Sequence, residues 1–381
     1  MNQLGLLLIV SAQGRGLALA GSAVAAVGVG AAVSAPVVGR LIDRFGPVRV
    51  LCAAMLLQVM GLAGVLVALR QGWSGPVVLA CAALVGLANP QTGSVTRAIW
   101  SALSRREKDP GRGLQIVRGG LGLESAADEV SFVVGPVSVG ALVTLLGGMG
   151  ATVALAVTTV VGEGMLVAWL ARHPGMLTSA GRPDPAGAPA AKAPVEKTPA
   201  PATAWGNLAP ILLAIVAVGA VFGTTQTALT AVHTAHGTPG LTGPVYGAMG
   251  VTSALAGLVS PALRYSPGTK VTVGGLFVVL SSSVLMTVPS TPVTVAVILL
   301  MGAGVGTALV TAYTLLEAQA VDGRLTSLMT YGATATVLGV SAASVLTGLV
   351  GENLHMGNAP GVAAGLVLVG LGGRMLLLRR G

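Results

Sequence analysis

Ionisable side chains within apolar stretches are the residues of this sequence best placed to do chemistry, since charges in apolar surroundings are costly and usually functional. They are Arg97, Arg118, Glu124, Asp128, Glu129 and Glu163. Glu124 and Asp128, four residues apart, share one face of a helix, whereas Glu129 points elsewhere. Three acids this close need compensating cations, such as Arg97 and Arg118, if all are to be ionised. The cluster therefore either takes part in proton transfer or gating, or forms a static charge network that fastens two helices.

Glu163 stands apart from this cluster. It lies roughly 12 Å along a helix from the basic residue Arg172, and no basic residue is near it in sequence. Two interpretations stay open for it: a proton carrier, or a structural acid that is neutral or hydrogen-bonded.

Long apolar runs must position these side chains. Hydrophobic residues make up 53% of the 381 residues and charged residues 9%, whereas soluble domains carry about 25% charged residues. Runs of roughly 20 apolar residues match the hydrocarbon core of a bilayer, and the alternation of barrel strands is absent. The sequence therefore predicts an all-α polytopic membrane protein. The expected spans are 17–38, 50–70, 76–101, 114–146, 149–171, 207–231, 240–263, 270–288, 291–317, 325–350 and 359–378.

The apolar segment Leu4–Val10 is too short to be a full span. It covers about half of a ~30 Å hydrocarbon core, and we interpret it as the second half of a helix whose start lies upstream of Met1. The alternative is the apolar region of a signal peptide, which usually follows a basic segment and precedes a small-residue cleavage site. Neither feature is present.

Basic residues fall on one side of the expected spans. All but two of the 21 Lys and Arg residues lie in connections on the same side, and the exceptions are Arg15 and Arg70. Cytoplasmic loops carry such an excess, so we expect that side, with the C-terminus, to face the cytoplasm. The formal charge of +9 therefore sets topology and gives no reason to expect a nucleic-acid partner.

Residues 172–206 form a segment rich in Pro and Ala that has few bulky apolar residues. Such composition is typical of a flexible linker. It predicts three parts: an N-terminal bundle over 1–171, a cytoplasmic linker over 172–206 and a C-terminal bundle over 207–381.

A charged motif stands between the first two expected full spans. It reads Gly39-Arg40-Leu41-Ile42-Asp43-Arg44-Phe45-Gly46-Pro47-Val48-Arg49. Gly46 allows a tight reversal, and Asp43, among arginines at a membrane boundary, should be ionised and paired. Such a charge cluster can latch two bundles in one state and release them in the other. We expect a conformational gating loop made of Gly39, Asp43, Arg44, Gly46 and Arg49.

This segment resembles the signature G-x-x-x-D-R-x-G-R-[RK]-x of the major facilitator superfamily, except that Pro47 and Val48 replace the usual basic pair. The resemblance implies two six-helix bundles in a 12-helix layout, whose first helix is incomplete here. It also implies a small-molecule substrate, protons and the bilayer of the cell membrane as partners, and a monomer. We expect no cofactor and no metal.

A second motif lies in the span 114–146, around Gly135, Pro136 and Gly140. It resembles a reduced form of the motif G-x-x-x-G-P-x-x-G-G of drug/proton antiporters, in which Ser131 and Ala141 replace two glycines. Pro136 removes a backbone hydrogen bond and should bend the helix. An ordinary proline bend is the alternative. The resemblance favours export over uptake.

The family resemblance also implies that the first, fourth, seventh and tenth helices line the substrate cavity. Their polar side chains are then candidates for substrate contact, although Ser and Thr often bond only their own backbone. The candidates are Asn89, Gln91, Thr92, Gln226 and Tyr313.

The function we expect is proton-coupled efflux of a small, largely apolar compound by alternating access. The alternatives are solute uptake by the same fold and a non-transporting membrane scaffold or sensor. Patterns typical of ATP-driven pumps and of hydrolases are missing from the sequence, so we do not expect an enzyme.

Overall fold

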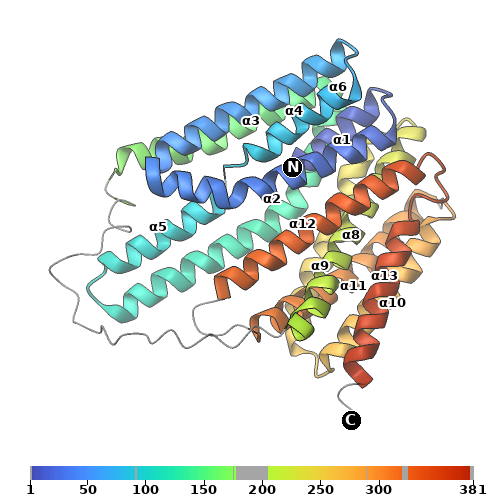
Figure 1. The fold of residues 1–381 in the computed structure, drawn as a ribbon. Helices are drawn as coiled ribbons and strands as arrows, with labels where there is room; N and C mark the ends of the chain where they lie inside the picture. The colour runs from blue at the N-terminus through green and yellow to red at the C-terminus, as the bar shows by residue number, and fades with distance from the viewer. Residues whose placement is uncertain are drawn as a thin grey trace.

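The computed structural model describes residues 2–90, 92–174, 176, 205–288, 290–319 and 325–377, and within these ranges the chain forms helices and no β-strand (Figure 1). The α-helices are α1 (Asn2–Ala12), α2 (Leu17–Phe45), α3 (Pro47–Arg70), α4 (Gly75–Leu87), α5 (Thr92–Arg106), α6 (Pro110–Arg172), α8 (Trp205–Ala235), α9 (Thr242–Val259), α10 (Pro267–Leu285), α11 (Thr291–Glu317), α12 (Leu325–Val350) and α13 (Ala359–Leu377). Two short 3-10 helices, η1 (Pro239–Leu241) and η2 (Ser260–Ala262), flank α9.

Nine helices in this described part of the chain are long and apolar enough to cross a membrane. A helix satisfies every backbone amide internally, which an apolar solvent requires. Many large apolar side chains are exposed on the outside of the helices, such as Leu145 and Leu258. Those faces suit lipid, so the prediction of an all-α multi-pass membrane protein is confirmed.

One predicted span is wrong, because 76–101 is two helices. α4 ends at Leu87 and α5 begins at Thr92. Pro90 explains the break: proline lacks the N–H that a continuous helix needs, and its ring disfavours the helical conformation at Asn89. The amide of Asn89 bonds to the carbonyl oxygen of Gly86 instead, as in a tight final turn.

Two other boundaries differ from the prediction. α2 continues to Phe45 instead of ending at 38, so most of the expected loop 39–49 is helical. Gly46, with φ of 84°, is the single residue between α2 and α3. α6 runs through the two predicted spans 114–146 and 149–171, which meet at a kink where Gly147 has φ of 68°. Both glycines adopt a conformation that side chains with a Cβ rarely take.

The helices pack in two groups. Helices α1–α6 contact one another, as do α8–α13, and in Figure 1 the blue-to-green and the yellow-to-red helices gather on different sides. The groups meet mainly where α2 packs on α12 and α6 packs on α9, with a smaller contact of α1 with α8. When α4 and α5 are counted as one interrupted helix, the second helix of each group contacts the fifth of the other, which is the pattern that a two-fold relation between the groups would produce.

The helix ends define two ends of the molecule. One, which we call the Gly14 end, joins the connections Gln13–Gly16 and Gln71–Ser74 through a hydrogen bond from Arg15 to the carbonyl of Trp73. At this end α1 and α8 also meet, with Ser11 Oγ 3.3 Å from Thr234 Oγ1. The other, the Gly46 end, carries the connections at Gly46, Glu107–Asp109 and Leu263–Ser266.

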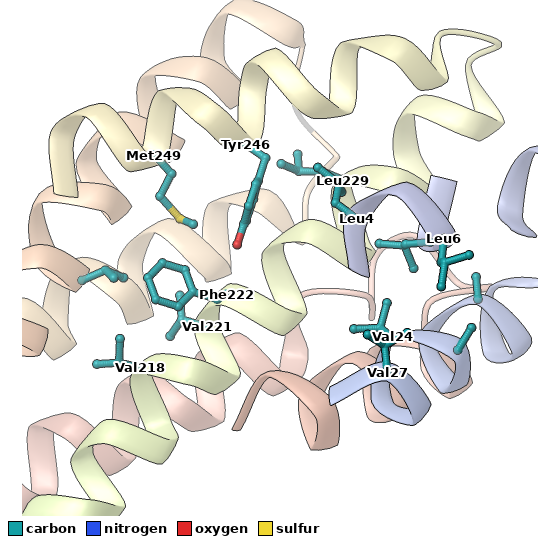
Figure 2. Packing of buried hydrophobic residues seen from close by; sticks show 14 of the residues in the cluster. Leu4, Leu6, Val24, Val27, Val218, Val221, Phe222, Leu229, Tyr246 and Met249 are labelled. Carbon is teal, nitrogen blue, oxygen red and sulfur yellow. The ribbon is translucent and has the colours of Figure 1, made fainter. Parts of the chain in front are cut away.

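The larger of two apolar clusters in the described structure spans both groups (Figure 2), and the smaller one lies within the first group around Leu51 and Ile99. Leu6 of α1 and Val24 and Val27 of α2 are buried in the larger cluster, and Phe222 of α8 and Met249 of α9 continue it in the second group. α1 is short, yet the side chains from Leu4 to Val10 are almost fully enclosed. Its burial fixes the packing of α2 and α6 around it.

Candidate functional site

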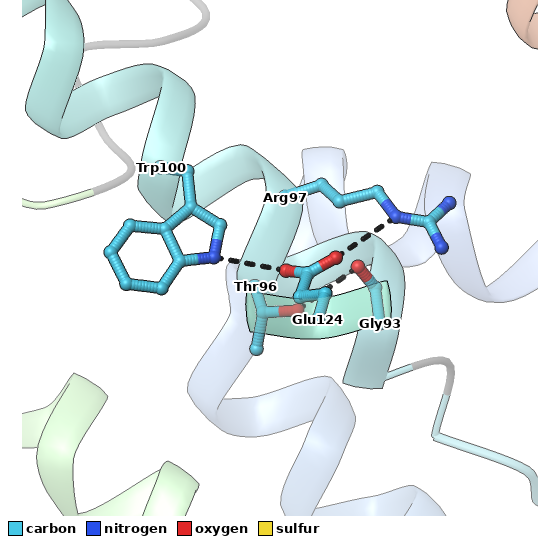
Figure 3. Close-up of polar contacts among 5 residues, drawn as sticks. All are labelled: Gly93, Thr96, Arg97, Trp100 and Glu124. Atoms are coloured by element: carbon cyan, nitrogen blue, oxygen red, sulfur yellow. Dashed lines mark hydrogen bonds and ion pairs between the residues drawn. The ribbon is translucent and has the colours of Figure 1, made fainter. Parts of the chain in front are cut away.

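The predicted charge cluster is present in part. Glu124 of α6 accepts a hydrogen bond and ion pair from Arg97 Nε at 3.1 Å and a hydrogen bond from Trp100 Nε1 at 3.0 Å. Figure 3 shows the carboxylate held between the two side chains of α5. Arg97 and Trp100 are three residues apart and so lie on one face of that helix. The arrangement ties α5 to α6 with every bond directed at one carboxylate.

Burial of this pair is uneven. The side chain of Glu124 is 16% exposed and that of Arg97 is 61% exposed. An ion pair with an exposed partner contributes little to stability, so the bond from Trp100 is the better-shielded contact. Three other members of the predicted cluster, Arg118, Asp128 and Glu129, have side chains outside the described part of the structure.

Glu163 lies in a different place from the cluster. It lines a polar cavity of about 440 Å³ among α1, α3, α5 and the second part of α6. Its Oε2 is buried and has no hydrogen-bond partner among the described residues. A carboxylate oxygen in this situation is costly unless something else occupies the cavity.

Sequence reasoning missed a second residue of this cavity. Gln58 of α3 lines it with only 3% of its surface exposed, and its Oε1 also lacks a partner within the described structure. The signal that could have found it was an amide in the middle of the apolar run Val50–Leu69. Uncompensated amides at that depth are expensive.

The motif 39–49 is helical up to Phe45 and exposed. Asp43 makes no ion pair with a described residue, and the pairing expected for it stays a prediction. The guanidinium of Arg44 instead lies 5.1 Å from the ring centroid of Phe45. A Cβ on Gly39 would meet no atom within 4 Å. Arg49 and Phe45 line an apolar groove of about 470 Å³ between α2, α3 and α4.

The second motif lies at the contact between the two groups. A Cβ on Gly140 of α6 would overlap the carbonyl oxygen of Gly240, and one on Gly243 of α9 would overlap the carbonyl oxygen of Pro136. Gly135 is buried in the same stretch of α6. Small residues allow two helices this close. The α6–α9 contact near the Gly14 end is therefore made of backbone against backbone.

The contact of α2 with α12 has the same character. A Cβ on Gly21 would overlap the carbonyl oxygen of Ser344, and one on Gly348 would come within 2.8 Å of the carbonyl oxygen of Leu17. Both positions belong to the halves of α2 and α12 nearer the Gly14 end. Nothing in the sequence motifs singled out Ser344 or Gly348.

The predicted cavity residues divide between three places. Thr92 begins α5 and lines the same polar cavity as Glu163. Asn89 lies in the break before it and makes an interaction of its own, while Gln91 is outside the described residues. Gln226 is buried in α8, with Nε2 3.4 Å from Ser344 Oγ of α12. Tyr313 of α11 lies 3.4 Å, oxygen to oxygen, from Thr336 of α12.

The family model described as Major Facilitator Superfamily matches residues 4–344. No curated protein sequence matches the chain.

Three solved structures share the fold. A nucleoside transporter, NupG, has a TM-score of 0.68 at 13% identity, with 100% of this chain and 97% of that chain covered. A bacterial homologue of the iron transporter ferroportin in an inward-facing state has a TM-score of 0.63 at 13% identity, with 97% of each chain covered. The xylose transporter XylE from E. coli in an inward open conformation has a TM-score of 0.57 at 14% identity, covering 96% of this chain and 94% of that one.

Proposed function

Because this chain belongs to the major facilitator superfamily, whose members are secondary transporters and not enzymes, we propose that it exports a small, largely apolar compound in exchange for protons. The fold supports transport by alternating access. The observation that carries the proposal is the set of close backbone contacts of α6 with α9 and of α2 with α12, which within the described residues join the two helix groups near the Gly14 end.

We propose that the two groups, residues 1–171 and 207–381, rock as units about these contacts, with 172–206 as the linker. Close contacts between the groups at the Gly14 end support a state that is closed there, which is an inward-open state. In it the Gly46 end faces the cytoplasm, as the excess of basic residues on that side supports.

Two features favour export with proton coupling, and a third bears on the substrate. The first is the partial antiporter motif, whose Pro136 and Gly140 lie in the contact between groups. The second is the presence of two acids within the membrane, Glu124 and Glu163. The third is scarcity of aromatic residues, 3% of the chain, which argues against a sugar-binding site. Polar contacts to the compound would come from Thr92, Gln226 and Tyr313, with Asn89 and Gln91 beside them.

The test uses purified protein in lipid vesicles with an imposed pH gradient. Ethidium, a small aromatic dye, serves as first probe, followed by a panel of lipophilic compounds. We expect movement of a compound against the direction of proton flow, and loss of that movement when a protonophore collapses the gradient. Flux that ignores the gradient rules out proton coupling. Flux in the same direction as protons supports uptake, and the absence of any flux across the panel favours the scaffold.

A further inference from the structure

Several side-chain oxygen atoms line the cavity beside Glu163, together with Asn2 and the apolar side chains of Leu155 and Leu166. Its lining includes Gln58, Thr92, Thr96, Thr158, Thr159 and Glu163, contributed by α3, α5 and the second part of α6. The hydroxyl of Thr96 donates to the carbonyl of Gly93 at 3.1 Å, and that of Thr158 donates to the carbonyl of Ala154 at 2.8 Å. Because these hydrogens point to the backbone, the hydroxyl oxygens keep their lone pairs for another partner.

Two further oxygens in the cavity have no partner in the part of the chain that the structure describes. They are Oε1 of Gln58 and Oε2 of Glu163, and both are buried. Gln58 is 3% exposed, so bulk water does not satisfy it. Unpaired buried acceptors cost free energy. A cavity that gathers several acceptors and one carboxylate attracts a cation.

No described side chain of the surrounding helices supplies that cation to Glu163 Oε2. α1 carries no charged residue, and α3 carries Arg49 and Arg70 only near its ends. Arg97 of α5 is largely exposed and points its Nε at Glu124. Glu163 is the only titratable side chain among the residues that line the cavity. The site therefore has one negative charge and neutral oxygen ligands.

We propose that this cavity binds a hydrated monovalent metal cation of the Na⁺ class, with the Glu163 carboxylate, the Gln58 amide oxygen and the Thr96 and Thr158 hydroxyls as its oxygen ligands. A single carboxylate balances one positive charge, whereas sites for Ca²⁺ usually combine several carboxylates. The volume of about 440 Å³ leaves room for water around the ion. A protonated carboxyl group binds Na⁺ far more weakly than a carboxylate does, so binding of Na⁺ favours release of any proton on Glu163 to water.

The site lies within the first helix group, away from the α2–α12 and α6–α9 contacts. Thr92, which begins α5 directly after the helix break, also lines it. Broken helices commonly border ion sites in transporters, because their interrupted turns leave backbone groups free for a ligand. The inference goes beyond the proposed function and does not depend on the substrate or its direction.

The experiment measures equilibrium binding of ²²Na⁺ to the purified full chain in detergent. We expect saturable binding that unlabelled Na⁺ displaces, and no displacement by Ca²⁺ at the same concentration. E163Q should abolish saturable binding. Q58L should weaken it by at least about tenfold, or about 1.4 kcal/mol. Glu352→Gln, which removes one exposed carboxylate at the Gly14 end, should bind as the unchanged chain does.

Three results would overturn the site: no saturable binding by the unchanged chain, equal binding by E163Q, or stronger displacement by Ca²⁺ than by Na⁺. E163Q removes an uncompensated buried charge, so it should remain folded, and its elution volume in size-exclusion chromatography checks this. Transport is not needed for the measurement. Sodium binding without transport contradicts only the proposed function, and transport without sodium binding contradicts only the ion site.

Discussion

Glu124 accepts one hydrogen bond from the exposed side chain of Arg97 and one from the better-shielded side chain of Trp100. This difference in exposure predicts that the bond from Trp100 contributes more to stability. Replacing Trp100 with Phe keeps most of the ring that packs on Gly120 but removes the bond from Nε1 to a shielded carboxylate. We expect a loss of about 1 kcal/mol in stability. Replacing Arg97 with Ala should cost less, since that side chain is largely exposed. Thermal stability in detergent, followed by size-exclusion chromatography, measures both.

A larger loss of stability in the Arg97 variant than in the Trp100 variant would mean that the charge of Arg97 matters more than its exposure suggests. It would favour the reading of this pair as a gating element over a static fastening between α5 and α6.

Asp43 offers a test of the gating role at a residue with no stabilising contact here. The side chain is exposed and unpaired among the described residues, so Asp43→Asn should change stability by no more than about 0.5 kcal/mol. If Asp43 forms a latch only in the opposite state, the same change should lower transport by at least about tenfold. A vesicle flux assay beside a thermal stability curve separates the two effects. Unchanged flux would leave Asp43 with no role in gating.

Single residues of the candidate site were only partly predictable from the sequence. It identified Glu124 and its partner Arg97 because charges in apolar runs are conspicuous, and it set Glu163 apart from them without indicating which side chains surround Glu163. Only the packing of α5 shows that Arg97 and Trp100 face Glu124 while Thr92 and Thr96 line the cavity of Glu163. Gln58 escaped notice because an amide carries no charge, and its cost depends on burial that only tertiary structure defines.

The α6–α9 contact between the groups is made through glycine residues, so a larger side chain at one of them tests it. A valine at Gly243 would overlap the carbonyl of Pro136, so G243V should force α9 away from α6 at the Gly14 end. We expect a cysteine placed at Thr144, which lies next to Gly240, to react faster with a membrane-impermeant maleimide when G243V is present. Cys52 and Cys81 are replaced beforehand.

The matched control is Gly370→Val, because a Cβ on Gly370 would meet nothing within 4 Å. Equal labelling rates in G243V and this control would mean that the helices absorb the extra methyl groups without separating, and that the contact is not a gate.

Helix positions were predicted from apolar runs to within a few residues for α3, α11, α12 and α13. The errors arose where local chemistry outweighs hydropathy. Pro90 divides an apolar run that looks continuous by hydropathy alone. The polar segment after residue 38 stays helical because the chain reverses its direction only at Gly46. The kink at Gly147 fell where two runs meet, so the sequence did predict that boundary.

The whole molecule should behave as two bodies joined near one end. Spin labels at Lys108 and Tyr265 would report the separation of the groups at the Gly46 end, and labels at Gln71 and Met356 would report it at the Gly14 end. G243V opens the Gly14 end if the groups rock, so the first distance should shorten while the second lengthens. Pulsed electron–electron double resonance measures both distances between spin labels. Two distances that change in the same direction would exclude rocking of rigid groups.

The backbone contacts between α6 and α9 and between α2 and α12 also bear on the energetics of this movement. The glycine contacts themselves bury few side-chain methyl groups, so parting them alone exposes little apolar surface, whereas parting the side chains of the core that spans both groups would expose more. Exposure of apolar surface is the main source of a positive heat-capacity change. A movement confined to the glycine contacts should therefore have a nearly constant enthalpy and a straight Arrhenius line, and a curved line would show that side chains of the shared core become exposed as well.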